Sequence, residues 1–345
     1  MTQFGVFDHL DRGGFELGEL YANRLSLVEA YDRAGFRGYH LAEHHGTSLG
    51  MAPCPGVFLS AVAQRTRKLR LGPSVYVLPS HDPLRLIEEI CMLDQLSGGR
   101  LELGVGRGFS PFELGFFGVE SAQSRERYLE AYQVLMQGLA SDTLTFEGKH
   151  FRYRDVPMVL KPVQRPHPPV WYGMVGADGA PWAAANGINV LMNGPAARSR
   201  PLTDSYWNEF EKAPASVHST QPLLGLTRHV HVADTDELAL KAARQAYGVW
   251  YQSNAELWNR FKTETRIFPP TLDDAIRAGT AIVGSPRTVA ERIDEDLRAS
   301  GANYLVSRLA FGDLTLDRLL HCVDLFAAEI MPAFSSSSSR AAVGA

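Results

Sequence analysis

Short apolar runs alternate with longer amphipathic stretches along most of the chain, and this alternation limits the possible folds more than any other feature. In such a pattern each apolar run forms a buried strand, and each amphipathic stretch forms a helix that links two parallel strands. We expect strands over residues 4–8, 38–42, 69–77, 101–106, 169–174, 188–192, 227–232 and 303–307. Eight such units predict an α/β fold of the (β/α)8, or TIM-barrel, type.

The segments between these strands predict the rest of the molecule. Helices are expected over residues 17–34, 55–64, 83–96, 124–139, 179–185, 198–211, 237–261, 286–299 and 315–330. Residues 144–153 alternate around a Glu-Gly-Lys turn, which is typical of a β-hairpin outside the barrel wall. Residues 262–279 lack clear periodicity, so we interpret them as an active-site lid. We predict one domain over residues 1–334 and a disordered tail over residues 335–345.

The composition narrows the class of protein. The chain has 345 residues, of which 45% are hydrophobic and 21% charged, as in a globular enzyme. The net charge of −4 comes with scattered basic residues, which argues against nucleic acid as a partner. The 3 cysteines are far apart and indicate neither a disulfide framework nor a zinc cluster. Because we find no signal-peptide pattern and no run of membrane-spanning length, we expect a cytoplasmic protein with no membrane association.

Active sites of α/β barrels lie at the carboxyl ends of the strands, so polar residues that follow an apolar run are candidates for chemistry. Glu43, His44 and His45 directly follow the second expected strand. A histidine titrates near neutral pH and an adjacent carboxylate can orient it, so this cluster predicts a general base. A solvated turn is the alternative interpretation. We predict no metal site, because adjacent histidines on an extended segment point in opposite directions.

Glycine-rich turns follow two further strands. Gly106 and Arg107 belong to a Gly-x-Gly-x-Gly run, in which glycines let the backbone approach a ligand and the arginine offers planar donors to a phosphate or a flavin edge. The spacing differs from a Rossmann fingerprint, so it predicts no dinucleotide site. Val175, Gly176 and Gly179 belong to a segment that leaves a strand and opens an expected helix, where free N–H groups can hold an anion.

Several segments carry a resemblance to a known family. They are residues 41–45, residues 93–100 leading into the turn at 106–108, residues 182–184 with Gly187, the pair Trp250 and Tyr251, and residues 283–286. Their order and spacing resemble the bacterial luciferase-like flavin-dependent monooxygenases, over nearly the whole chain. The resemblance implies a barrel that binds reduced FMN at its carboxyl end. It also implies that a separate NAD(P)H:flavin reductase supplies this FMN, which reacts with O2 to form a flavin C4a-hydroperoxide.

The resemblance also assigns roles to individual residues. His44 is similar to the catalytic histidine of the family, with His45 and Glu43 beside it. Arg107 and Arg125 are similar to the contacts of the flavin and its phosphate.

Ser74 and Val75 match the place where the family has a non-prolyl cis peptide beneath the flavin ring. The resemblance further implies a homodimer built from the helices that follow the second and third strands. Apolar positions expected at that interface are Val57, Phe58, Leu86, Ile90 and Leu93.

The chain departs from the family pattern at several positions. Gly106 stands in place of a reactive cysteine, and Glu113 in place of an aspartate. Val175, Gly176 and Gly179 replace a Glu, Ser and Thr group around the phosphate. Backbone amides and the two arginines are therefore left to hold the phosphate.

We expect an FMN-dependent monooxygenase that acts on a small apolar aldehyde, ketone or similar substrate. A deazaflavin-dependent hydride-transfer enzyme and a non-catalytic flavin-binding protein are the alternatives. Candidate pocket walls, which would serve equally well as barrel core, are Phe7, Val75, Met174, Leu191, Met192 and Trp250.

Overall fold

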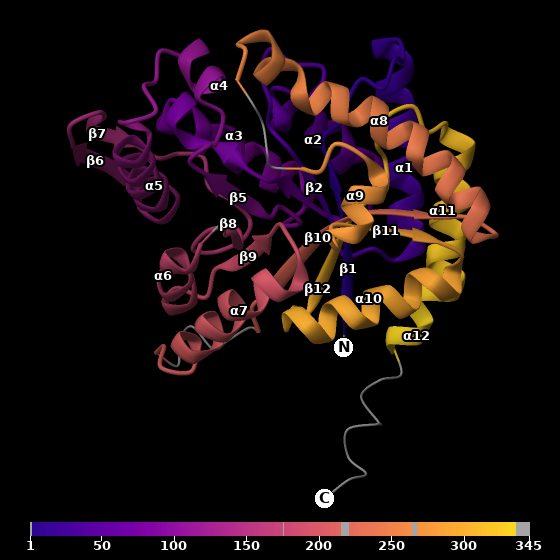
Figure 1. The fold of residues 1–345 in the computed structure, drawn as a ribbon. Helices are drawn as coiled ribbons and strands as arrows, with labels where there is room; N and C mark the ends of the chain where they lie inside the picture. The colour runs from indigo at the N-terminus through magenta and orange to yellow at the C-terminus, as the bar shows by residue number, and fades with distance from the viewer. Residues whose placement is uncertain (1, 175, 215–220, 264–267, 336–345) are drawn as a thin grey trace, which may run out of the picture.

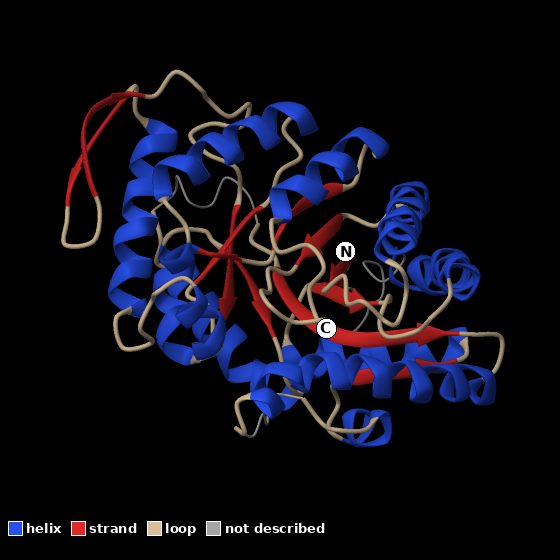
Figure 2. Ribbon diagram, turned by 90° about the horizontal axis from the view of Figure 1, so that it is seen from above, coloured by secondary structure: helices blue, strands red, loops and turns tan. Residues whose placement is uncertain are grey.

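The computed structural model describes residues 2–174, 176–214, 221–263 and 268–335, and its centre is a sheet of parallel strands (Figure 1). The strands are β1 (Gln3–Asp8), β2 (Gly38–Leu41), β3 (Arg70–Pro73), β4 (Tyr76–Val77), β5 (Leu103–Gly106), β8 (Val170–Met174), β9 (Asn189–Met192), β10 (Leu224–Val232), β11 (Ala281–Gly284) and β12 (Tyr304–Arg308). Viewed from above, the strands lie in the middle and helices surround them (Figure 2). The predicted TIM barrel is confirmed.

One strand of the barrel is bent into two halves. β3 pairs with β2, β4 pairs with β5, and Leu71 forms an isolated bridge with Leu101. The two halves therefore fill one position, and with β1, β2, β5, β8, β9, β10 and β12 they complete the eight positions of the barrel. Between the halves, the Ser74–Val75 peptide is cis, as predicted.

Helices cover the outside of the strands. They are α1 (Leu17–Ala34), α2 (Pro55–Arg65), α3 (Pro83–Ser97), α4 (Pro111–Phe116), α5 (Ser124–Ala140), α6 (Ala180–Ala185), α7 (Ala196–Phe210), α8 (Asp236–Arg260), α9 (Leu272–Arg277), α10 (Pro286–Ser300), α11 (Leu316–Leu325) and α12 (Met331–Ser335). Shorter turns are the 3-10 segments η1 (Leu78–Ser80) and η2 (Ala177–Gly179), and the π-helix η4 (Phe326–Ile330). Among the described residues, no helix is both long and apolar enough to cross a membrane.

The segment interpreted as a lid contains regular structure that the sequence pattern does not predict. Residues 264–267 lie outside the described residues, but α9 follows them and buries Leu272 and Ala275. β11 then pairs with His229–Val232, which lie beyond the part of β10 that pairs with β9. β11 thus covers backbone groups that a strand of nine residues would otherwise leave unpaired.

The hairpin outside the barrel wall is confirmed. It consists of β6 (Thr143–Glu147) and β7 (Arg152–Pro157), which are antiparallel and project from the ring of helices (Figure 2). Residues 336–345, nearly all of the predicted tail, lie outside the described residues. The division into one domain and a tail stays a prediction.

The face of each strand decides which apolar residues reach the barrel interior. Phe7 and Leu191 belong to a buried interior cluster with Ala42, Trp171, Leu223, Tyr304 and Val306. Met174 and Met192 are also buried, but they belong to the larger core that includes the surrounding helices. Because side chains alternate along a strand, Met192 cannot share the interior face with Leu191. Met192 therefore faces the surrounding helices, and a role of Met174 and Met192 as pocket walls stays a prediction.

The apolar positions expected at a dimer interface differ in exposure. Four of them are buried within the chain, namely Phe58, Leu86, Ile90 and Leu93. Val57 is 75% exposed, and Met92 and Leu96 on α3 are exposed as well. Four of the five expected positions therefore pack in the core of the chain itself, and only Val57 among them is exposed.

Candidate active site

Glu43, which follows β2, is a buried carboxylate held by several donors. It accepts hydrogen bonds from His45 Nε2 at 3.0 Å, from His81 Nε2 at 3.0 Å and from the Val77 N–H at 3.1 Å. Burial raises the pKa of Glu43, but the hydrogen bonds from His45 and His81 outweigh burial and lower the pKa to about 2. Although burial lowers the pKa of His81, the hydrogen bond to Glu43 raises it above its ordinary value. Glu43 therefore positions two histidines and is a poor base itself.

His44 points away from Glu43, because neighbouring side chains on an extended segment alternate. Its Nδ1 lies 3.3 Å from both carboxylate oxygens of Glu113, which also accepts a hydrogen bond from the His45 N–H at 3.0 Å. A carboxylate only accepts, so neutral His44 carries its proton on Nδ1 and leaves Nε2 as the free base. Glu113, and not the adjacent Glu43, is the carboxylate that orients His44.

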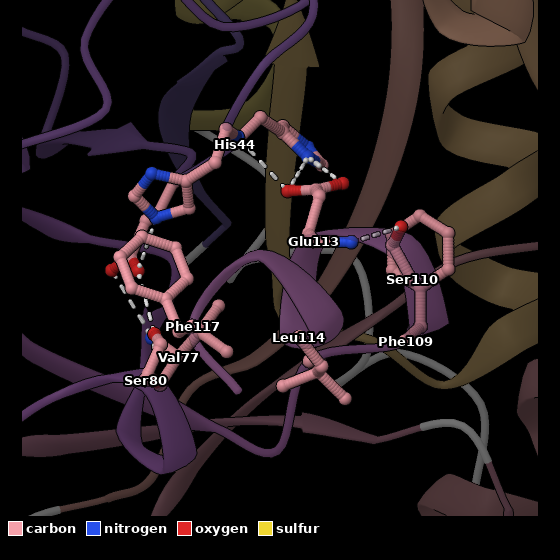
Figure 3. A pocket seen from close by; sticks show the side chains of 11 residues that line it. His44, Val77, Ser80, Phe109, Ser110, Glu113, Leu114 and Phe117 are labelled. Atoms are coloured by element: carbon pink, nitrogen blue, oxygen red, sulfur yellow. Dashed lines mark hydrogen bonds and ion pairs between the residues drawn. The ribbon is translucent and has the colours of Figure 1, made fainter. Parts of the chain in front are cut away.

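Glu113 reaches His44 from α4, a helix that the sequence pattern does not predict. Ser110 caps this helix by accepting a hydrogen bond from the Glu113 N–H at 3.3 Å. Figure 3 shows Glu113 between His44 and Ser110 in the wall of a pocket whose apolar part includes Phe109 and Phe117. The pocket therefore combines a base with aromatic surface.

The glycines of β5 serve the packing of the bent strand. A Cβ added at Gly106 would lie 2.4 Å from Val75 Cγ2, and one at Gly104 would lie 2.0 Å from the Pro73 carbonyl oxygen. These contacts explain both glycines without a ligand. Ser74 and Val75 are only partly buried, so the bend itself can be reached from outside. Contact of Ser74, Val75 and Gly106 with a flavin stays a prediction.

Arg107 and Arg125 are exposed cations without a partner among the described residues. Arg107 follows β5, and Arg125 lies in the first turn of α5. That turn packs against η1, because Arg127 Nε donates to the Pro79 carbonyl at 2.8 Å. One turn further along α5, the buried Tyr128 hydroxyl has no hydrogen-bond partner in the described part of the chain. These donors suit an anionic ligand at the edge of the barrel.

The loop between β8 and α6 lies beside α5. Trp182 of α6 contacts Tyr132 of α5 and Tyr172 of β8, with ring centroids 5.4 and 5.6 Å apart. Gly176 is exposed and Gly179 partly buried, whereas the predicted contact Val175 lies outside the described residues. The predicted phosphate contacts thus come from neighbouring elements.

A second group of rings fills the carboxyl end of the barrel interior. His9 lies 4.9 Å from Phe7, 5.7 Å from His44 and 5.7 Å from Trp250, measured between ring centroids. Trp250 comes from α8 and is fully buried. Of the predicted pocket walls, Phe7 and Trp250 therefore both contact His9, and His9 in turn contacts His44.

Sequence reasoning missed His9, His81, Asn193 and Arg308. The rule applied to Glu43 would have found three of them, because His9 and Asn193 follow β1 and β9 directly and Arg308 ends β12. His81 gives no such signal, since it follows a short turn. Among the described residues, no group of three or more His, Cys, Asp or Glu side chains could hold a metal ion.

Comparisons with known proteins agree with this fold. The family model for luciferase-like monooxygenases matches residues 2–304, so the chain belongs to that family. Protein y4wF of Sinorhizobium fredii is 44% identical over 95% of this chain and 96% of its own length. The oxygenase component of the flavin-dependent trigonelline monooxygenase of Acinetobacter baylyi is 25% identical over 97% of this chain and 96% of its own. The prediction of a monooxygenase-class enzyme is thereby confirmed at the level of the family.

Solved structures share the fold at lower identity. Monooxygenase RslO1 of Streptomyces bottropensis superposes with a TM-score of 0.86 at 24% identity, covering 96% of this chain and 99% of its own. The oxygenating constituent of 3,6-diketocamphane monooxygenase of Pseudomonas putida, in complex with FMN, gives 0.75 at 19%, with coverages of 96% and 98%. An F420-dependent secondary alcohol dehydrogenase gives 0.73 at 16%, with coverages of 96% and 98%. The fold is therefore compatible with either cofactor.

Proposed function

We propose that the chain is the oxygenase of a flavin-dependent monooxygenase that takes reduced FMN from a separate NAD(P)H:flavin reductase and oxidises a small substrate with O2. The observation that carries this proposal is the hydrogen-bonded His44–Glu113 pair at the mouth of a barrel of the luciferase-like family. The relative named as a flavin-dependent oxygenase component supports both the cofactor and the need for a reductase.

The polar groups of the mouth fit FMN. The unpaired Arg107 and Arg125 would hold the phosphate, and the orphaned Tyr128 hydroxyl lies on the same helix as Arg125. The exposed Gly176 leaves its backbone N–H free of side-chain cover. When bound, reduced FMN supplies the electrons that activate O2.

His44 is the group that can move a proton beside the reacting atoms. Glu113 holds Nδ1, so Nε2 remains the acceptor and its ring orientation is constrained. His45 and Glu43 support this residue, since Glu43 holds the His45 ring while the His45 N–H binds Glu113. The aromatic surface of Phe109 and His9 around His44 limits water at the base.

Binding and turnover experiments separate this proposal from its alternatives. We expect the chain to bind FMN or reduced FMN more tightly than F420, and to consume O2 when an NAD(P)H:flavin reductase and FMN are added. F420 binding without O2 uptake would instead support a deazaflavin-dependent hydride-transfer enzyme. FMN binding with no effect on the rate of flavin reoxidation would support a non-catalytic flavin-binding protein.

Assembly and location remain proposals. We propose a homodimer that uses the exposed Val57, Met92 and Leu96 on α2 and α3, and a cytoplasmic location. Replacing Met92 with Glu would place a charge in such an interface, so sedimentation should shift towards monomer. A monomeric wild-type chain at working concentration would contradict the proposed dimer.

A further inference from the structure

Arg308, the last residue of β12, is a buried cation without a counter-charge. It is 3% exposed, and its Nε has no hydrogen-bond partner among the described residues. Its Nη2 donates to Asn193 Oδ1 at 2.7 Å, but no carboxylate of the described chain forms an ion pair with it. A buried charge without a partner is costly, so such groups are retained where a ligand completes them.

The surroundings of Arg308 are aromatic. Its guanidinium carbon lies 4.7 Å from the Phe7 ring centroid and 5.4 Å from that of Phe268. The Phe268 ring lies 5.0 Å from Trp250, and the His229 ring lies 4.3 Å from Trp250. A flat apolar molecule can pack between such rings while the guanidinium binds a planar group at its edge.

Other buried polar atoms without a partner among the described residues lie in the same group of rings. Trp250 Nε1 and His229 Nε2 are buried and have no hydrogen-bond partner within the described residues. Burial is the main cause that lowers the pKa values of His9 and His229 well below the ordinary range, so both are neutral near pH 7. Burial also lowers the pKa of Arg308 to about 9, which still leaves it charged at neutral pH. Arg308 therefore supplies the positive charge of this group.

The site is close to both solvent and the candidate base. Asn193, which accepts from Arg308, is exposed, and Phe268, whose ring packs against the guanidinium, is partly exposed, so these two side chains separate Arg308 from solvent. In the other direction, Phe7 contacts both Arg308 and His9, and His9 contacts His44. A ligand held by Arg308 would thus extend towards His44.

We infer that this group is an oxyanion subsite, in which Arg308 binds a carboxylate-type group of a small substrate whose apolar body packs among Phe7, Trp250 and Phe268. This inference rests on the proposed function, because it names the class of substrate for the same site. It adds an anionic group to the small apolar substrate expected from the sequence.

Benzoate and benzamide provide a matched pair of probes, since they have nearly the same shape and differ in charge. Calorimetric titration of the purified full chain, with and without FMN, should show benzoate binding at least about tenfold more tightly than benzamide. The preference should disappear in Arg308→Met and persist partly in Arg308→Lys. Arg292→Met, which removes an exposed arginine on α10 and changes the net charge equally, should keep the full preference.

Thermal unfolding distinguishes a binding role from a structural one. Because Arg308 has no counter-charge, Arg308→Met should melt no lower than the wild type in the absence of a ligand. If Arg308→Met does not fold, the ratio of benzoate to benzamide affinity in the wild type and in Arg308→Lys still tests the binding role of Arg308.

Equal binding of the two probes by the wild type, or an unchanged preference in Arg308→Met, would overturn the inference. A loss of FMN affinity with the benzoate preference intact would instead assign Arg308 to the FMN phosphate. The assay requires neither reduced flavin nor O2, so its failure would leave the proposed oxygenase function standing.

Discussion

The two ends of the barrel interior treat buried charge in opposite ways. At the amino ends of the strands, Glu102 is 1% exposed and forms ion pairs with Arg70 and, at 3.0 Å, with Arg37, while Trp171 Nε1 donates to it as well. At the carboxyl ends, Arg308 is equally deep but has no carboxylate partner in the described chain. At the amino ends, which we call the closed end, the buried charges form ion pairs with one another. At the carboxyl ends, which we call the open end, Arg308 keeps a hydrogen-bond donor that a ligand could use. Buried charges at the amino ends thus serve stability, whereas those at the carboxyl ends are available for function.

The closed end should show the largest effect on stability. Glu102→Ala leaves two arginines without their buried partner, so we expect the free energy of unfolding to fall by about 3–5 kcal/mol. Urea denaturation measures this change. Glu126→Ala, which removes exposed ion pairs with Lys149 and His150, is the control and should leave the free energy of unfolding nearly unchanged. A similar loss in both variants would remove the distinction between the two ends.

The open end should show the largest effect on activity. His44→Ala removes the proposed base, so product formation should fall by at least ~100-fold while the fold and most of the flavin affinity remain. His321→Ala, which removes an exposed histidine paired with Asp234, should retain activity. Near wild-type turnover would move the catalytic assignment elsewhere in the mouth.

The Glu43–His81 pair tests whether a paired charge at the open end stabilises the fold as the paired charges at the closed end do. The lowered pKa of Glu43 stabilises the fold above about pH 4.5, and this contribution is lost as pH falls through about 2. The raised pKa of His81 stabilises the fold below about pH 6.5, and this contribution is lost as pH rises through the folded-state value. The pair should therefore contribute most between these two limits.

His81→Gln measures that contribution. We expect a loss of about 1.5–3 kcal/mol near pH 5.5. The difference from the wild type should shrink at pH 9 and again at pH 3, as followed by thermal unfolding at each pH. A difference that does not change with pH would show that His81 acts through packing alone.

The exposed arginines should give the smallest effect. Arg107→Ala or Arg125→Ala should weaken FMN binding by roughly tenfold, because each removes a charge-assisted contact from the proposed phosphate site. Fluorescence titration with FMN provides the measurement, and Arg292→Ala on the far side of the barrel serves as the control. Unchanged affinity in both variants would place the phosphate elsewhere.

Much of the fold follows from local pattern. The apolar runs predict the eight barrel positions because a buried parallel strand needs a continuous apolar segment, and they also place Glu43, His44 and His45 at a strand end. The pattern misses β11 and α9, since these short elements gain their order from packing on β10 and α8 rather than from their own periodicity. It also misses α4, whose six residues are too few to show a period.

The sequence by itself determined the barrel, its hairpin and the histidine cluster at the second strand, because each depends on residues that are close together in the chain. Only the tertiary structure decided which charges meet. Glu113 reaches His44 from 69 residues away, and Arg308 meets Asn193 from 115 residues away. Such pairs form because closure of the barrel brings the carboxyl ends of all its strands to one mouth. Which of the charges at the mouth are paired there depends on this three-dimensional arrangement.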